Sequence, residues 1–339
     1  SWTLDSAGTL TISGSGKMND YSYIGRAPWY SNCSSIKKIN FEGEITSIGK
    51  YAFSGCHKFT TITIPSTVKT IGERAFNQCN GVKDIYFEGY VSNVGSEAFQ
   101  CGALENVHIS DAVSWRYSNF ADAMANPIRV GDNIYVNGVI PTEIIIPEGA
   151  TSIGDYAYYG WSEVTKVVIP KSMRKIGKGA FSGCSKISYV GISSYDDWCN
   201  IVFGDRLSSP VVQSGSIYIN GEKPSKIIIP EGVTTVKTGV YSGWDCKTIE
   251  LPDTVTTIEE GAFYKCKGAS VINIPESVTK IGEYAFAYCD ALTSVTIPEA
   301  VTNIGRFAFA ACPNIRTINF NARECSDFTN ESLSTTPRA

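Results

Sequence analysis

The stretch VTIPEAVTNIGRFAFAACPNI, residues 295–315, recurs in altered form along nearly the whole chain. Residues 272–292 are INIPESVTKIGEYAFAYCDAL, and residues 62–82, far upstream, are ITIPSTVKTIGERAFNQCNGV. Each copy has a β-branched run that ends in Ile-Pro, then Val-x-x-Ile-Gly, then Ala-Phe, then Cys. Repetition at a period of about 20–50 residues is the signature of a solenoid, in which each coil buries its apolar side chains only against its neighbours.

The position of the proline in each copy sets the register, and we call it the anchor. Consecutive anchors are evenly spaced, except for two longer steps from Ser110 to Pro147 and from Ser193 to Pro230. The anchors are Glu42, Pro65, Glu88, Ser110, Pro147, Pro170, Ser193, Pro230, Pro252, Pro275, Pro298 and Asn321. The spacing therefore predicts a β-rich, right-handed coil of about twelve turns, with two long coils at residues 111–147 and 194–230.

The two long coils are copies of each other. The offset in sequence from Trp115 to Trp198 equals the offset from Tyr135 to Tyr218. Each copy has a tryptophan segment that is expected to form a short helix, followed by a strand and an Asn-Gly turn, IYVNG or IYING. Because loops on a rigid scaffold commonly carry function, these insertions are candidates for a binding site.

Within a regular coil, the alternation over residues 271–274 predicts a strand, and Pro275 ends it because proline cannot donate to a sheet. Gly282 is expected to supply a turn with positive φ. The following run EYAFAYC is expected to form one helical turn, with Phe286 and Cys289 facing inward. Stacked coils should place a parallel sheet on one side of the solenoid.

This pattern resembles the BspA-like leucine-rich repeats of bacterial surface proteins, over residues 33–321. The resemblance implies a curved leucine-rich-repeat solenoid, display outside the cell, and a role in adhesion or host contact. It brings no catalytic residues with it. Residues 1–32 are then an N-terminal cap, and residues 322–339 are a C-terminal tail or linker.

The cap sequence WTLDSAGTLTI predicts a hairpin followed by an aromatic lead-in. An open solenoid end exposes its core and sheet edges, so a cap is required there. An alternative is that Trp2, Tyr21, Tyr23 and Trp29 form an aromatic platform for a ligand.

Eight of the eleven cysteines share one column of the repeat: Cys33, Cys56, Cys79, Cys101, Cys184, Cys266, Cys289 and Cys312. Trp161 and Trp244 occupy that column in two further coils. We expect a ladder of small buried thiols rather than a disulfide framework. The wide, regular spacing of these cysteines matches no zinc signature, and no cofactor or metal is predicted.

Composition narrows the possible functions. Charged residues make up 18% of the chain and the net charge is −4, which argues against nucleic-acid binding. No apolar run is long enough to span a membrane. The chain begins with Ser1-Trp2 rather than methionine, which predicts a mature region from which a signal peptide has been removed. With only His57 and His108 as histidines, no catalytic triad is suggested, and no enzymatic activity is expected.

The residue two before each anchor is expected to point outward from the sheet. This column is mostly polar towards both ends of the array, but in the middle it is Ile145, Val168, Gly191 and Ile228. A strand that is apolar on both faces is normally covered on both. We expect the inserted segments to fold over these residues; the alternative is that a partner binds them.

The candidate binding face predicted from the sequence comprises Ile145, Val168, Tyr189, Ile228, Glu143, Lys166, Lys226, Trp115 and Trp198. For the two tryptophans, packing into a widened core is favoured over ligand contact.

The sequence thus indicates a non-enzymatic, monomeric interaction module on a bacterial cell surface, which binds a host or neighbouring-cell protein. A carbohydrate-binding module and a passive spacer between other domains are the alternatives.

Overall fold

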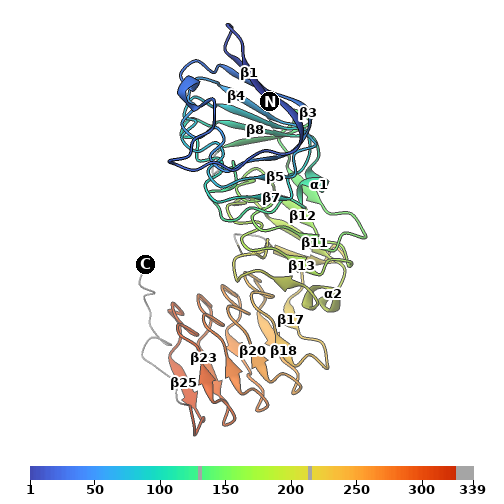
Figure 1. Ribbon diagram of the computed structural model, residues 1–339. Coiled ribbons are helices and arrows are strands. Elements are labelled where there is room, and N and C mark those ends of the chain that lie inside the picture. Colours follow the sequence, from blue (N-terminus) through green and yellow to red (C-terminus); the bar gives the residue numbers. More distant parts are fainter. Residues whose placement is uncertain (129–131, 213–215, 326–339) are drawn as a thin grey trace. The chain divides into compact units, whose positions relative to one another are not determined.

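The computed structural model describes residues 1–128, 132–212 and 216–325 (Figure 1). Most of the predicted tail, residues 322–339, lies outside the described residues. The chain forms two compact units. The first contains residues 1–144 and 153–163, and the second contains residues 145–152 and 164 onward.

Both units are built from stacked coils, so the predicted parallel-sheet solenoid of about twelve turns is confirmed (Figure 1). A regular coil has a front strand that ends at the anchor, such as β23 (Ser294–Ile297) before Pro298. A two-residue back strand follows, such as β24 (Asn303–Ile304). Alternation places Val295 and Ile297 in the core and leaves Thr296 exposed.

The first unit has four front strands in parallel, with Thr63, Tyr86, His108 and Tyr135 in register. They are β4 (Thr61–Ile64), β6 (Asp84–Phe87), β8 (Asn106–Ile109) and β9 (Asn133–Val136). Its other sheet contains β1 (Trp2–Leu4), β2 (Thr9–Lys17), β3 (Lys38–Ile48), β5 (Thr70–Ile71) and β7 (Asn93–Val94). The predicted hairpin is confirmed, because β1 pairs antiparallel with β2, and β2 then runs parallel to β3.

The second unit has two consecutive front sheets and matching back sheets. The front strands are β12 (Lys166–Val168), β14 (Tyr189–Ile192) and β16 (Ser216–Ile219), then β17 (Lys226–Ile228), β19 (Thr248–Glu250), β21 (Val271–Ile272), β23 and β25 (Thr317–Phe320). The back strands are β13 (Lys175–Ile176), β15 (Val202–Phe203), β18 (Thr235–Val236), β20 (Thr257–Ile258), β22 (Lys280–Ile281) and β24. Strands β10 (Glu143–Ile145) and β11 (Ser152–Ile153) contain two of the boundaries between the two units, and the third falls between Glu163 and Val164.

The third side of each coil is not the helical turn that the sequence suggests. Tyr284 and Tyr288 have left-handed φ values of 53° and 60°, and the N–H of Phe286 between them donates to the carbonyl of Ala308 at 2.8 Å. A helical turn would direct these N–H groups along its own axis. Here alternate N–H groups point to the next coil, so neighbouring coils are hydrogen-bonded on this side too.

Gly282 is required for a different reason from the one predicted. Its φ lies outside the left-handed region, which falls two residues later at Tyr284. A Cβ on Gly282 would lie 2.5 Å from the carbonyl carbon of Glu259 in the preceding coil. The glycine column therefore exists because neighbouring coils approach closely at this corner.

The core contains stacked aromatic rings from successive coils. Phe286 lies between Phe263 and Phe309, with ring centroids 5.2 and 5.3 Å apart and nearly parallel planes. Such a pair contributes about 0.5–1.5 kcal/mol beyond the burial of each ring. This ladder joins these neighbouring coils of the second unit through their core.

Most of the cysteine column consists of buried free thiols, as predicted. Five of these thiols donate to a backbone carbonyl of another coil, and the bond from Cys312 to Phe286 is 3.1 Å long; the five are Cys79, Cys101, Cys266, Cys289 and Cys312. The prediction is wrong for Cys33 and Cys56, which form a disulfide. The 3-10 helix η1 (Tyr30–Asn32) leads directly into Cys33, which places the two cysteines on adjacent coils with their Cα atoms 4.5 Å apart.

The long coils contain the predicted short helices, α1 (Ala112–Trp115) and α2 (Tyr195–Cys199). Their Asn-Gly turns are also confirmed, with φ of 50° and 79° at Asn137 and Gly138. The strand before each turn is also hydrogen-bonded into a sheet. Strand β9 pairs in parallel with β8, and β16 with β14, so each insertion adds a strand to a front sheet.

Candidate binding face

The front sheet of the second unit carries a continuous outward row. Val168, Gly191 and Tyr218 lie side by side on β12, β14 and β16. Ile145 precedes Val168, because the N–H of Ile146 donates to the carbonyl of Val168 at 3.1 Å, just as Ile169 bonds to Gly191 at 2.9 Å. The sheet register thus brings together three positions of the apolar column and adds Tyr218.

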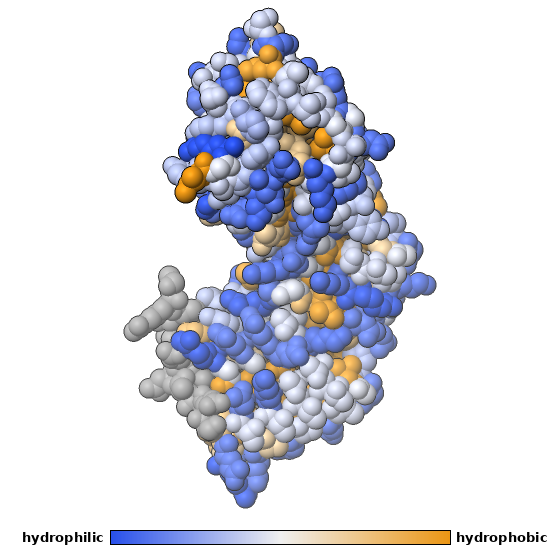
Figure 2. Space-filling model, viewed as in Figure 1, coloured by the Kyte–Doolittle hydropathy of each residue, from blue (hydrophilic) through white to orange (hydrophobic). Residues whose placement is uncertain are grey.

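These apolar side chains are accessible. Ile145 is 53% exposed, Ile228 on β17 is 36% exposed, and Val168 is half-buried. The expectation that the insertions cover Ile145 and Ile228 is therefore wrong. The physical reason is that the inserted strands extend sheets at their edges instead of crossing a face, since β9 pairs with β8 and β16 pairs with β14. In the view of Figure 2, apolar residues form small separate patches among polar ones.

Gly191 is the one buried member of the row, and Tyr189 covers it. A Cβ on Gly191 would lie 2.9 Å from Cε1 of Tyr189. The Tyr189 ring stacks on that of Tyr218, with centroids 4.3 Å apart. A glycine at this position makes room for an aromatic pair on the sheet surface.

Charged groups flank this row. The Lys166 ammonium lies 5.9 Å from the centroid of the Tyr189 ring, within cation–π range. Lys226 pairs with Glu250 at 3.0 Å, and its carbonyl accepts the hydroxyl of Tyr195 at 2.5 Å. Burial raises the pKa of Tyr195 to about 12, so this hydroxyl stays protonated and remains a donor.

The two tryptophans do not belong to a surface. Trp115 and Trp198 are buried, and their indole N–H groups donate to the carbonyls of Ala157 and Val240. The expected packing into the core is confirmed, and both residues are removed from the candidate face. Glu143 is exposed at the start of β10 and belongs to the first unit.

The first unit carries an aromatic ladder that the sequence analysis missed. His108 lies between Tyr86 and Tyr135, with ring centroids 4.1 and 4.9 Å apart and almost parallel planes. Nε2 of His108 lies 3.5 Å from Oδ1 of Asp84. The ladder is visible only once the strand IYVN is recognised as part of the sheet. The sequence signal that could have indicated this ladder is that Tyr135 and Tyr218 occupy equivalent positions in the two long coils.

A family model described as BspA type leucine rich repeat region, in six copies, matches residues 22–136, 128–209 and 213–336. These matches cover most of the 339 residues. The chain belongs to the BspA-type leucine-rich-repeat family. No curated protein matches the BspA-type chain.

Several solved bacterial proteins are similar to this chain. A leucine rich cell surface protein from Faecalibacterium prausnitzii has a TM-score of 0.51 at 20% identity, over 100% of this chain and 96% of that one. A leucine-rich repeat protein from Eubacterium ventriosum has a TM-score of 0.42 at 24% identity, over 98% and 89%. The pneumococcal vaccine antigen PcpA has a TM-score of 0.48 at 16% identity, over 94% and 81%. Because its sequence identity is low, the Faecalibacterium protein shows the fold alone.

The duplicated BspA-type block builds its two aromatic surfaces from different positions. Asn106 and His108 of the first copy correspond to Tyr189 and Gly191 of the second, at the same sequence offset that relates Tyr135 to Tyr218. In the first copy the stacked ring belongs to His108, at the outward position itself. In the second copy it belongs to Tyr189, whose ring covers Gly191 at the outward position. A stacked ring beside Tyr135 or Tyr218 is thus present in both copies, although its sequence position differs.

The described residues of this BspA-type chain contain neither a cluster of metal-ligating side chains nor a helix that could span a membrane. Among the described residues, no three His, Cys, Asp or Glu side chains gather in a way that could hold a metal ion. The two α-helices in that part of the chain have four and five residues, and no helix there is long and apolar enough to cross a bilayer. The matched family is defined by a repeat architecture and indicates no enzyme class.

Proposed function

We propose that the chain is a non-enzymatic interaction module of a bacterial cell-surface protein, which binds a protein partner outside the cell. The binding surface is the apolar front face, defined as Ile145, Val168, Tyr189, Tyr218 and Ile228. The partner is a protein of a host or of a neighbouring cell.

The exposure of Ile145 and Ile228 on parallel front strands carries this proposal. Faces of parallel sheets are normally covered, and exposed apolar rows bordered by charges are typical of protein-binding sites. The same column further along the second unit is polar and exposed, at Glu250, Asn273 and Thr296. The apolar character is therefore local and is not imposed by the repeat.

The aromatic and charged residues of the apolar front face also favour a protein-binding function over that of a passive spacer. Aromatic rings that are rigidly stacked, such as Tyr189 on Tyr218, offer contact area at a small cost in side-chain entropy. Lys166 lies beside the Tyr189 ring, and Lys226 is on β17 with Ile228, as charged groups are at the rim of interfaces.

Two observations support an extracellular location. The Cys33–Cys56 disulfide is of a kind that persists mainly in oxidising compartments. The Faecalibacterium protein that shares the fold is itself described as a cell surface protein.

The test is binding to immobilised extracellular-matrix proteins at physiological salt, with Ile145→Glu and Ile228→Glu variants. We expect saturable binding that each substitution weakens at least tenfold, because it places a charge in a desolvated contact. Thr296→Glu is the matched control, since Thr296 is exposed in the same column of the repeat.

Equal binding by Ile145→Glu, Ile228→Glu and Thr296→Glu would show that the apolar front face is not the site. Absence of binding across the panel, by a correctly folded chain, would favour the spacer function instead.

A further inference from the structure

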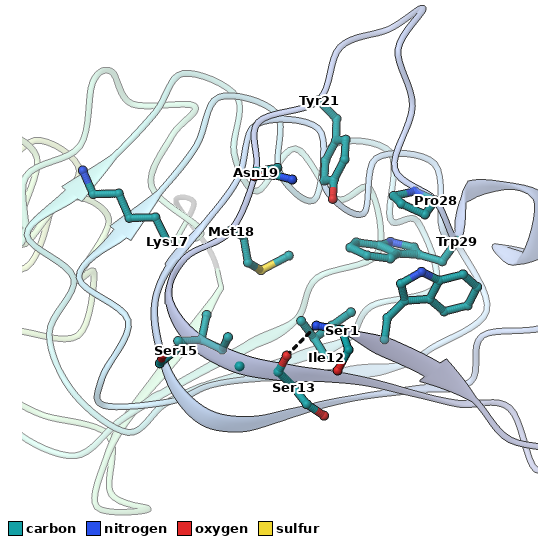
Figure 3. Close-up of a pocket in the computed structure, with 13 residues that line it drawn as sticks. Ser1, Ile12, Ser13, Ser15, Lys17, Met18, Asn19, Tyr21, Pro28 and Trp29 are labelled. Atoms are coloured by element: carbon teal, nitrogen blue, oxygen red, sulfur yellow. Dashed lines mark hydrogen bonds between the residues drawn. The ribbon is translucent and has the colours of Figure 1, made fainter.

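The N-terminal cap of the first unit contains a hollow whose residues have no role in the proposed protein contact (Figure 3). Trp2, Met18, Tyr21 and Trp29 contribute its apolar walls, and Ser13, Ser15 and Asn19 contribute polar groups. Figure 3 shows Tyr21, Trp29 and Met18 directed towards the hollow, with Lys17 directed away from it.

The walls are held by backbone hydrogen bonds to the first coil. The N–H of Met18 donates to Ser47 at 3.3 Å, and that of Tyr21 donates to Lys50 at 2.9 Å. The carboxylate of Asp20 accepts the N–H of Lys50 at 2.8 Å. The hollow is therefore formed before any ligand arrives, as binding sites usually are.

The aromatic side chains are arranged in two layers. Trp29 is buried, stacks on Phe53 and donates its indole N–H to the carbonyl of Ala52 at 2.8 Å. Trp2 and Tyr21 both pack edge-to-face on Trp29, with centroids 6.1 and 5.7 Å away. Trp29 thus supports the two outer rings, and Trp2 keeps 38% of its surface exposed.

Hydrogen-bonding groups surround these rings. The Ser13 hydroxyl, in the lining of the hollow, donates to the Glu42 carboxylate at 3.3 Å. Partial burial raises the pKa of Tyr21, so its hydroxyl stays protonated. At Gly14 a Cβ would meet nothing within 4 Å, so the strand beside the hollow leaves open space there.

We propose that this hollow binds a sugar residue of a glycan. A pyranose has one apolar C–H face and a circumference of hydroxyls, which matches an exposed tryptophan beside serine, asparagine and tyrosine hydrogen-bonding groups. An apolar peptide side chain would offer no hydrogen bonds to Ser15, Asn19 and Tyr21. Of the aromatic platform considered from the sequence, Trp2, Tyr21 and Trp29 are brought together; Tyr23 is 74% exposed and does not line the hollow.

The experiment is an array of oligosaccharides ending in glucose, galactose, mannose, N-acetylglucosamine or sialic acid, followed by calorimetry with the free sugar of any hit. Trp2→Ala is expected to weaken binding at least tenfold through loss of the stacking ring. Tyr21→Phe keeps the ring and is expected to weaken binding several-fold. Tyr23→Ala is the matched control, and circular dichroism verifies that each variant is folded.

Two results would overturn the proposal: no sugar on the array bound above background, or a hit whose affinity is equal in Trp2→Ala, Tyr21→Phe and Tyr23→Ala. Ile145→Glu must leave sugar binding unchanged, because the apolar front face belongs to the second unit. Failure of either site is thereby distinguished from failure of the other.

Discussion

Replacing Gly282 by alanine tests how closely neighbouring coils approach. The added Cβ would lie 2.5 Å from the carbonyl carbon of Glu259 and 2.6 Å from the nitrogen of Glu260. Both are backbone atoms of the preceding coil, so no side-chain rotation relieves the contact. Ordinary van der Waals contact begins at 3.4 Å, and the coils must therefore separate locally by about 0.9 Å.

The cost follows from the bonds that cross this gap. The N–H of Gly282 donates to Ile258 at 2.7 Å, and that of Gly261 donates to Glu283 at 2.8 Å. A separation of this size stretches both beyond hydrogen-bond range, which loses about 1 kcal/mol each. Overpacking adds about 1–3 kcal/mol. The free energy of unfolding should fall by about 3–5 kcal/mol.

Gly232 provides the comparison, because its φ is 85° and a Cβ there would meet nothing within 4 Å. Gly232→Ala carries only the left-handed backbone cost of about 1–2 kcal/mol. Urea unfolding followed by circular dichroism measures both variants. If Gly232→Ala proves as costly as Gly282→Ala, or if Gly282→Ala is nearly neutral, close approach is not what requires the glycine column.

Three further predictions concern the cysteines and a helix cap. Reducing the Cys33–Cys56 disulfide, whose cysteines have a sequence separation of 23, should lower the free energy of unfolding by about 3 kcal/mol. Dithiothreitol should lower the melting temperature of the unsubstituted chain but not that of a Cys33→Ala/Cys56→Ala variant. An unsubstituted chain whose melting temperature does not change would contradict this. Burial raises the pKa of Cys266 well above its usual value, so Ellman's reagent at pH 8 should modify this thiol only in urea; mass spectrometry showing rapid labelling of the folded chain would contradict this. Burial opposes ionisation of Asp111, but the Ser114 hydroxyl and the N–H groups of Ser114 and Val113 outweigh it and lower the pKa of Asp111. The contribution of ionised Asp111 to the free energy of unfolding is therefore complete above about pH 4 and is lost as pH falls through the folded-state pKa. Asp111→Ala should cost about 1 kcal/mol at pH 7, and Asp111→Asn should flatten the acid dependence of stability; identical acid profiles for Asp111→Asn and the natural chain would contradict the assignment.

The candidate sites were only partly predictable from sequence. The apolar column identified Ile145, Val168 and Ile228, because alternation along a strand separates its two faces. It did not show that Tyr189 covers Gly191, since that contact depends on how far a ring two residues away can reach. The ladder around His108 and the hollow beside Trp2 were missed or incompletely described, because each joins residues from separate strands and loops.

The sequence by itself determined the coil register, the strand before each anchor proline and the inward ladder of Phe263, Phe286 and Phe309. In a solenoid each coil contacts only its neighbours, so a repeating pattern along one dimension specifies the core. Tertiary structure decided why Gly282 is a glycine, how Cys33 meets Cys56 and where β9 and β16 pair. These features depend on distances between atoms of neighbouring coils, and the residue pattern of a single coil does not specify such distances.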